Sequence, residues 1–252
     1  MGAGAGKGVF LGARTLSAAT TFEPHLVDLD HVSVRGLNHA LHALRPSSNM
    51  TRWRVLNPGG RHALAVGLDA AVEVEIIGHA GYYCAGMNKL ATVTVRGNAG
   101  TGVAENMMSG RVRVCGDASQ SAGASAHGGL LLIDGNASAR CGIALKGADI
   151  VVKGSVGHMS AFMAQAGTLT VLGDAGESLG DSIYEAQLFV RGMVASLGSD
   201  CIEKPMRDRH LAALRSRLDA AGFGGAIDVA EFRRYGSARR LYHFHVDNAG
   251  DY

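Results

Sequence analysis

The sequence predicts an all-β protein, a parallel β-helix of about seven coils, and three observations lead to this fold class. Glycines recur every 19 residues along the middle of the chain. Apolar residues stand two and four positions before each of these glycines, the alternation typical of a strand with one buried side. Two further columns, three and seven residues after each glycine, hold only small side chains.

A 19-residue unit is too short to bury a core of its own, so each unit must stack on its neighbours. Parallel pairing of the same strand in successive units gives a β-helix, in which seven coils span about 34 Å. Helical repeats would need longer apolar stripes at helical spacing, and the left-handed β-helices of acyltransferases have a six-residue period that does not divide 19.

The repeat glycines are expected at the corners of the coils, where a positive φ or a close backbone contact favours glycine. If φ is positive at Gly116, its replacement by Val should destabilise the fold by at least about 1 kcal/mol. Gly59 extends the series one step toward the N-terminus. The seven repeat glycines are Gly78, Gly97, Gly116, Gly135, Gly154, Gly173 and Gly192.

The segments before the repeat differ from it in kind. Residues 1–25 begin with GAGAGKG after the first Met and are expected to form a flexible leader. This stretch is not a phosphate-binding loop, because Lys7 is followed by Gly8 where that loop needs Ser or Thr. Residues 26–54 are predicted to form an N-terminal cap, a strand followed by a short helix, and residues 55–205 the β-helix domain.

The segments after the repeat are predicted to form a helix and a docking tail. Residues 206–225 place leucines on one face and end near Gly222, so they predict a helix that caps the open edge of the last coil. Residues 226–252 are rich in Arg, Tyr and Phe and are interpreted as a tail that docks on a partner. Its candidate docking residues are Arg233, Arg234, Tyr235, Arg240, Tyr242 and Phe244.

No catalytic, cofactor-binding or metal-binding residues are predicted on this chain. The four cysteines have no metal-binding spacing and are interpreted as buried, reduced core residues. The histidines of the coils fall in different columns. Asp117 and Asp174 stand directly after repeat glycines, where a role in the turn is favoured over acid–base chemistry.

Composition and charge exclude several classes of partner. The formal net charge is +2, with 24 basic and 22 acidic residues, which gives no general attraction to nucleic acid or to a membrane surface. No apolar run approaches the length of a membrane span, and the N-terminus is a poor signal peptide. A cytoplasmic location is therefore expected.

The glycine-rich coils carry a family resemblance. The stretches GHAGYYCAGMNKL, GNAGTGVAENMMSG and GDAGESLGDSIYEA resemble the GXGXG domain, the right-handed β-helix at the C-terminal end of glutamate synthase large subunits. The match covers roughly residues 55–205. The segments LVDLDHVSVRGLNHALH and FRRYGSARRLYHFHVDNAGDY look most like the small β-helix subunit of N-methylglutamate synthase and its GlxC-type relatives.

The resemblance implies a scaffold role in a hetero-oligomer. N-methylglutamate synthase converts methylamine and glutamate to N-methylglutamate and ammonia. In that family an amidotransferase-like subunit and a subunit with FMN and an iron–sulfur cluster carry the chemistry, and the β-helix supplies no catalytic residue. The alternatives are the β-helix scaffold of a formylmethanofuran dehydrogenase or of a formyltransferase/hydrolase complex, and a free-standing binding module or hydrolase.

Overall fold

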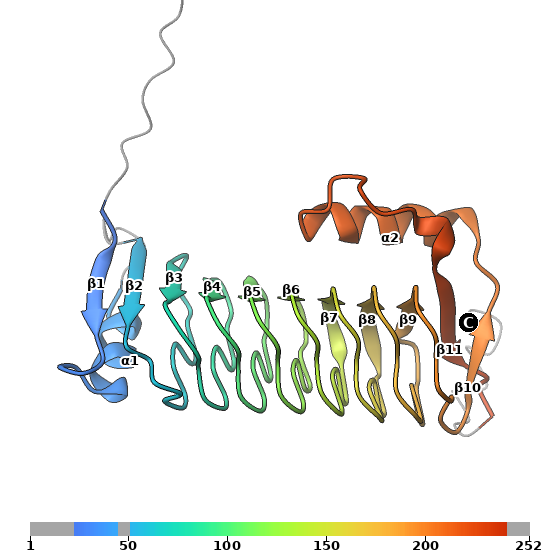
Figure 1. Cartoon of the computed structure of the whole chain (residues 1–252), viewed down its shortest axis with the longest axis horizontal. Helices are drawn as coiled ribbons and strands as arrows, with labels where there is room; N and C mark the ends of the chain where they lie inside the picture. Colours follow the sequence, from blue (N-terminus) through green and yellow to red (C-terminus); the bar gives the residue numbers. More distant parts are fainter. Residues whose placement is uncertain (1–22, 45–50, 241–252) are drawn as a thin grey trace, which may run out of the picture.

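The repeat forms one long sheet in the computed structural model, which describes residues 23–44 and 51–240. Strands β1 to β9 pair in parallel and in chain order, and β11 and β10 complete the sheet as antiparallel strands (Figure 1). The strands are β1 (His25–Asp28), β2 (Arg52–Leu56), β3 (Glu73–Ile76), β4 (Thr92–Val95), β5 (Arg111–Val114), β6 (Leu130–Ile133), β7 (Lys146–Val152), β8 (Ala166–Val171), β9 (Gln187–Val190), β10 (Cys201–Lys204) and β11 (Arg233–Ser237). The helices are α1 (Val34–His42), α2 (Asp208–Ala220) and the short 3-10 helix η1 (Val229–Glu231).

The predicted apolar columns fill the interior of the coils. Val74 pairs with Val93 and Val93 with Val112, so each strand is in register with the strand 19 residues later. Both columns are buried along the whole stack. The β-branched side chains of one coil therefore pack on those of the next, as the period-two pattern predicts. The fold class is confirmed.

The first coil is longer than the others, and this removes Gly59 from the series. Val55 of β2 pairs with Ile76 of β3, an offset of 21 residues in place of 19. Gly59 thus lies four residues after its strand valine, whereas Gly78 lies two residues after Ile76. The extension of the glycine series to Gly59 is wrong because the extra residues of this coil shift the register.

Glycine is required at the repeat positions mainly because neighbouring atoms leave no room for a Cβ, and less because of the backbone conformation. Only Gly78 among the seven has a positive φ, at +127°. At Gly116 a Cβ would lie 2.1 Å from the Asn98 Oδ1 of the preceding coil, and at Gly135 it would lie 2.3 Å from the Asp117 Oδ1. The positive-φ explanation is therefore wrong at six positions, and the close-contact alternative takes its place.

Left-handed backbone occurs instead in the small-residue column, seven positions after each of the first six repeat glycines. Ala85, Ala104 and Ala161 have φ values of 54°, 56° and 58°, and Gly123 and Gly180 have values of 67° and 66°. Alanine and glycine suit this column because larger or branched side chains are disfavoured in the left-handed region.

A ladder of side-chain acceptors joins the corners of successive coils. The residue directly after each of the first six repeat glycines accepts a hydrogen bond from the backbone N–H of the equivalent residue in the next coil, as in Asp117 N to Asn98 Oδ1 at 3.0 Å and Asn136 N to Asp117 Oδ1 at 2.7 Å. The acceptor ladder consists of His79, Asn98, Asp117, Asn136, Ser155 and Asp174. Asp117 and Asp174 are thus structural acceptors between coils, close to the turn role that their position predicts.

Helix α1 covers the open end of the first coil. Leu37 and Leu41 are buried against its core. The Asn38 side chain donates to the Ala63 carbonyl at 2.8 Å and accepts from the Ala65 amide at 3.0 Å. These bonds satisfy backbone groups of the first coil that would otherwise need a further coil as their partner. Helix α1 therefore ends the stack at its N-terminal side.

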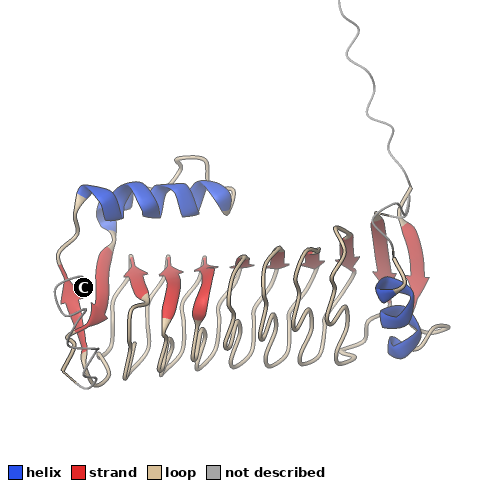
Figure 2. Ribbon diagram, turned by 180° about the vertical axis from the view of Figure 1, so that it is seen from behind, coloured by secondary structure: helices blue, strands red, loops and turns tan. Residues whose placement is uncertain are grey.

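The C-terminal end is covered by strands, and α2 lies on the side of the stack. Strand β11 pairs antiparallel with β9, and β10 pairs with β11. Helix α2 runs across the outer face of the sheet along β6 to β9 (Figure 2). The expectation that the 206–225 helix caps the last coil is wrong, because β11 pairs with the edge of β9. The apolar face of α2 packs instead on leucine, valine and phenylalanine side chains that face outward from the sheet. Gly222, with a φ of +96°, follows the helix end as predicted.

Candidate interaction surface on the outer sheet face

The outer face of the sheet is divided into a covered half and an open half. The division is visible in one column of outward-facing residues, which pair from each strand to the next. This column changes from charged or polar to mainly apolar between β5 and β6. In strand order this column is Arg54, Glu75, Thr94, Arg113, Leu132, Val151, Thr170 and Phe189. Leu132, Val151 and Phe189 are buried under Leu214 and Leu218 of α2. The half formed by β2 to β5 has no helix over it among the described residues.

Two polar bonds hold α2 on the covered half. The Arg111 guanidinium on β5 donates to the Ala220 carbonyl at the end of α2, at 2.7 Å. The Arg217 side chain of α2 bonds to Asp149 on β7 at 2.8 Å. The first bond satisfies a carbonyl that a helix end leaves without an intrahelical partner. Together they fix α2 where it lies.

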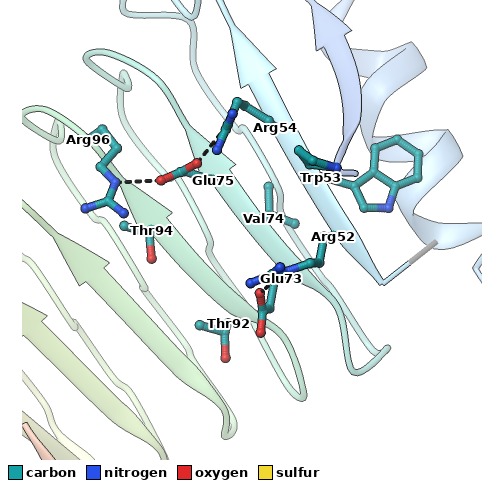
Figure 3. Close-up of a pocket in the computed structure, with 10 residues that line it drawn as sticks. Arg52, Trp53, Arg54, Glu73, Val74, Glu75, Thr92, Thr94 and Arg96 are labelled. Atoms are coloured by element: carbon teal, nitrogen blue, oxygen red, sulfur yellow. Dashed lines mark hydrogen bonds and ion pairs between the residues drawn. The ribbon is translucent and has the colours of Figure 1, made fainter. Parts of the chain in front are cut away.

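The open half carries a row of ion pairs across three strands (Figure 3). Arg52 on β2 pairs with Glu73 on β3 at 2.9 Å. Glu75 pairs with Arg54 at 2.9 Å on one side and with Arg96 at 2.7 Å on the other. The hydrogen bond from Arg96 is the largest influence on Glu75 and lowers the pKa of its carboxyl, and the bond from Arg54 adds to this against the opposing effect of burial. Glu75 is therefore held ionised between two cations.

A groove of about 350 Å³ lies over this open half. The outward side chains of β4 are the short Thr92 and Thr94, whereas β3 presents the long Glu73 and Glu75. Short side chains beside long ones leave a trough along the sheet. Because charged walls are costly to desolvate unless a partner supplies matching groups, the trough fits a polar protein surface better than an apolar ligand.

The predicted docking residues are in part built into the fold. Arg233, Arg234 and Tyr235 belong to β11, and Tyr235 is buried. Arg240 is exposed, with its backbone N–H bonded to Asp200 Oδ1 at 2.9 Å. Tyr242 and Phe244 lie outside the described residues. The first part of the predicted docking tail 226–252 thus closes the sheet, and the docking role itself stays a prediction.

The cysteines match the sequence interpretation at three of four positions. Cys84, Cys141 and Cys201 are buried and free, and burial raises the pKa of each thiol to about 12. Cys115 is free and half-buried, 3.8 Å from the Arg96 guanidinium. Within the described ranges, no group of three or more His, Cys, Asp or Glu side chains is placed to hold a metal ion.

These environments predict selective thiol labelling. At pH 8 iodoacetamide should modify Cys115 in the folded protein, while Cys84 and Cys141 react only after unfolding, since both thiols are fully buried and burial raises their pKa to about 12. Peptide mass mapping before and after denaturation measures this. A Cys115→Ser variant serves as the control and should lose the fast reaction. Rapid labelling of Cys84 would contradict a closed stack.

Along the described part of the chain, neither helix has the length and apolar character that crossing a membrane requires. The fold and the outer face define a β-solenoid protein in which its own helix covers one half of the sheet, while no described helix covers the other half. The chain belongs to the GlxC family. It is 58% identical over 227 residues to Protein GlxC of Rhizobium meliloti (strain 1021), a match that covers 90% of this chain and 99% of that protein. No family model and no solved structure matches the chain.

The open half of the sheet is the feature that the sequence prediction missed. The inward residues and the glycines predict the coils, but they carry no information about the outer face. The outward positions of the strands, aligned by the same 19-residue period, change from Arg113 to Leu132 between two consecutive coils. That change is the signal for both a helix over the apolar part and an exposed polar surface beside it.

Proposed function

We propose that this chain is a non-catalytic scaffold subunit of a glutamate-synthase-related complex, N-methylglutamate synthase, which converts methylamine and L-glutamate to N-methyl-L-glutamate and ammonia. Its partners are an amidotransferase-like subunit and a glutamate-synthase-like subunit that binds FMN and an iron–sulfur cluster. No residue of this chain is assigned to either cofactor. The β-helix holds the two partners at a fixed separation so that the amine passes between them.

The divided outer face is the observation that carries this proposal. A stack closed at both ends and sealed on half of its sheet leaves the groove over β2 to β4 as an open surface. Apart from the half-buried Glu75, the members of its ion pairs are exposed, and each pair contributes little to the stability of the free chain. Charged rows of this kind favour recognition and orientation of a partner. Membership of the GlxC family and the resemblance of the coils to glutamate synthase point to the class of partner.

Native mass and the visible spectrum test the proposal. The chain purified alone should be colourless, and co-expression with the products of its neighbouring genes should give a larger, yellow-brown complex that forms N-methylglutamate. A colourless complex with metal-hydrolase partners would instead support a formylmethanofuran or formyl-transfer complex. A chain that stays alone would contradict the scaffold role.

Filling the groove should block assembly without unfolding the chain. Thr92 is exposed on the groove floor, so a Thr92→Arg variant should keep its circular dichroism while its affinity for the partner falls at least about tenfold. Thr101→Arg places the same side chain at an exposed turn away from the groove and serves as the matched control. Equal assembly of both variants, measured by native mass, would show that this groove is not the docking surface.

A further inference from the structure

A second pocket lies at the C-terminal end of the stack, and its lining is strongly basic. It has a volume of about 430 Å³ and lies where the start of β9, the end of β10, the start of α2 and β11 meet. Its basic side chains are Lys204, Arg207, Arg209, Arg234 and Arg239. Glu185 is the one carboxylate of its lining, and it pairs with Arg239 at 3.3 Å.

The other four cations of this basic pocket have no acidic partner among the residues that the structure describes. Within residues 23–44 and 51–240, no carboxylate lies within ion-pair distance of Lys204, Arg207, Arg209 or Arg234, whereas Arg52, Arg54 and Arg96 on the open face all have one. The Arg234 guanidinium donates two of its five N–H groups to the Pro205 carbonyl, at 3.1 and 3.3 Å. Its remaining N–H groups are available to an anion.

The crowding of these cations is unfavourable in the free chain. Burial lowers the pKa of Arg234, and the neighbouring charges of Arg207 and Arg209 lower it further. Burial also lowers the pKa of His210, with smaller contributions from Arg234, Arg209 and Arg207. A negatively charged group in the pocket would replace this repulsion by attraction, and guanidinium groups bind carboxylates through paired hydrogen bonds.

We propose that this basic pocket binds the carboxylates of an acidic segment of a partner subunit, a proposal that rests on the scaffold function above. Arg207 and Arg209 are exposed and the pocket is open to solvent, whereas sites for small molecules enclose most of the ligand. Arginine is enriched in protein interfaces. The pocket lies at the β9 end of the stack, about 24 Å from β4. Two partners can therefore bind at the same time, one in this pocket and one in the groove.

Binding of labelled hexaglutamate to the full chain tests the pocket by fluorescence anisotropy. We expect saturable binding that weakens at least about tenfold in an Arg207→Gln/Arg209→Gln variant. An Arg35→Gln/Arg215→Gln variant makes the same charge change at exposed helix positions outside the pocket and should bind as the wild type does. Circular dichroism and melting verify that both variants fold. Equal loss in both variants would overturn the pocket, because the binding would then follow net charge alone.

Co-purification with the proposed partners tests the pocket proposal separately from the scaffold function on which it rests. The Arg207→Gln/Arg209→Gln variant should lose one partner subunit, while the control retains both. If the wild type assembles and this variant assembles equally well, the pocket proposal is wrong and the scaffold function stands. If, in that case, inorganic phosphate also displaces hexaglutamate from the wild type, the pocket binds a small anion instead of a partner segment. A wild type that binds hexaglutamate but no partner contradicts the scaffold function.

Discussion

Replacing Phe189 by Ala is expected to lower the free energy of unfolding by about 3–5 kcal/mol, the usual range for loss of a fully buried phenylalanine. Phe189 has no exposed surface and lies in the outer cluster between the sheet and α2, with Leu214 and Leu218. Urea denaturation followed by circular dichroism measures the change. Met193→Ala, at a side chain that is 74% exposed, is the control and should change stability by less than about 0.5 kcal/mol.

The part of the protein that Phe189→Ala destabilises shows whether the outer cluster and the interior of the coils unfold separately. Since Phe189 does not belong to the interior core, its loss should speed hydrogen exchange of the α2 amides more than that of the β3 to β5 amides. Uniform acceleration along all strands would show that α2 and the coils unfold as one unit.

Gly116→Ala is expected to destabilise the protein by about 2–3 kcal/mol, in the range of overpacked sites. The added methyl group would lie 2.1 Å from Asn98 Oδ1, and only 3.0 and 3.1 Å from the Gly97 carbonyl oxygen and carbon. The cause is steric, because φ at Gly116 is not positive.

A double-mutant cycle with Asn98→Ala tests this cause. Removing the Asn98 amide costs its hydrogen bond to the Asp117 N–H, about 1 kcal/mol, but also removes the nearest clash. The cost of Gly116→Ala should therefore fall to about 1 kcal/mol in the Asn98→Ala background, which leaves the contact with Gly97. Strict additivity of the two changes would show that the glycine is required for another reason.

The strands and the stack could be predicted from the sequence because they repeat. Val93, Val112 and Leu131 stand at one position of successive 19-residue units, and a parallel sheet is the simplest structure that buries such a column. The N-terminal cap followed from the amphipathic pattern around Leu37 and Leu41. These features depend on local spacing, which a single sequence displays.

The placement of the C-terminal segment could not be predicted in the same way. The leucines of α2 show that the helix has an apolar face, but the same pattern suits the end of the stack and the side of the sheet. The insertion of β11 between β9 and β10 depends on pairing between residues at least 30 positions apart, such as Tyr235 and Leu188. The basic pocket follows from that pairing, since it brings Arg234 beside Arg207 and Arg209.

The acceptor ladder has a direction, and that direction matches synthesis on the ribosome. Each acceptor belongs to the earlier coil and each N–H donor to the later one, from His79 to Met193. A coil that emerges therefore meets an acceptor already in place on the coil before it, beginning from α1 at the N-terminal end. At about 5–20 residues per second, one 19-residue coil emerges every few seconds, long enough for it to dock before the next follows. The stack can thus grow during translation one coil at a time, and β11 closes it last.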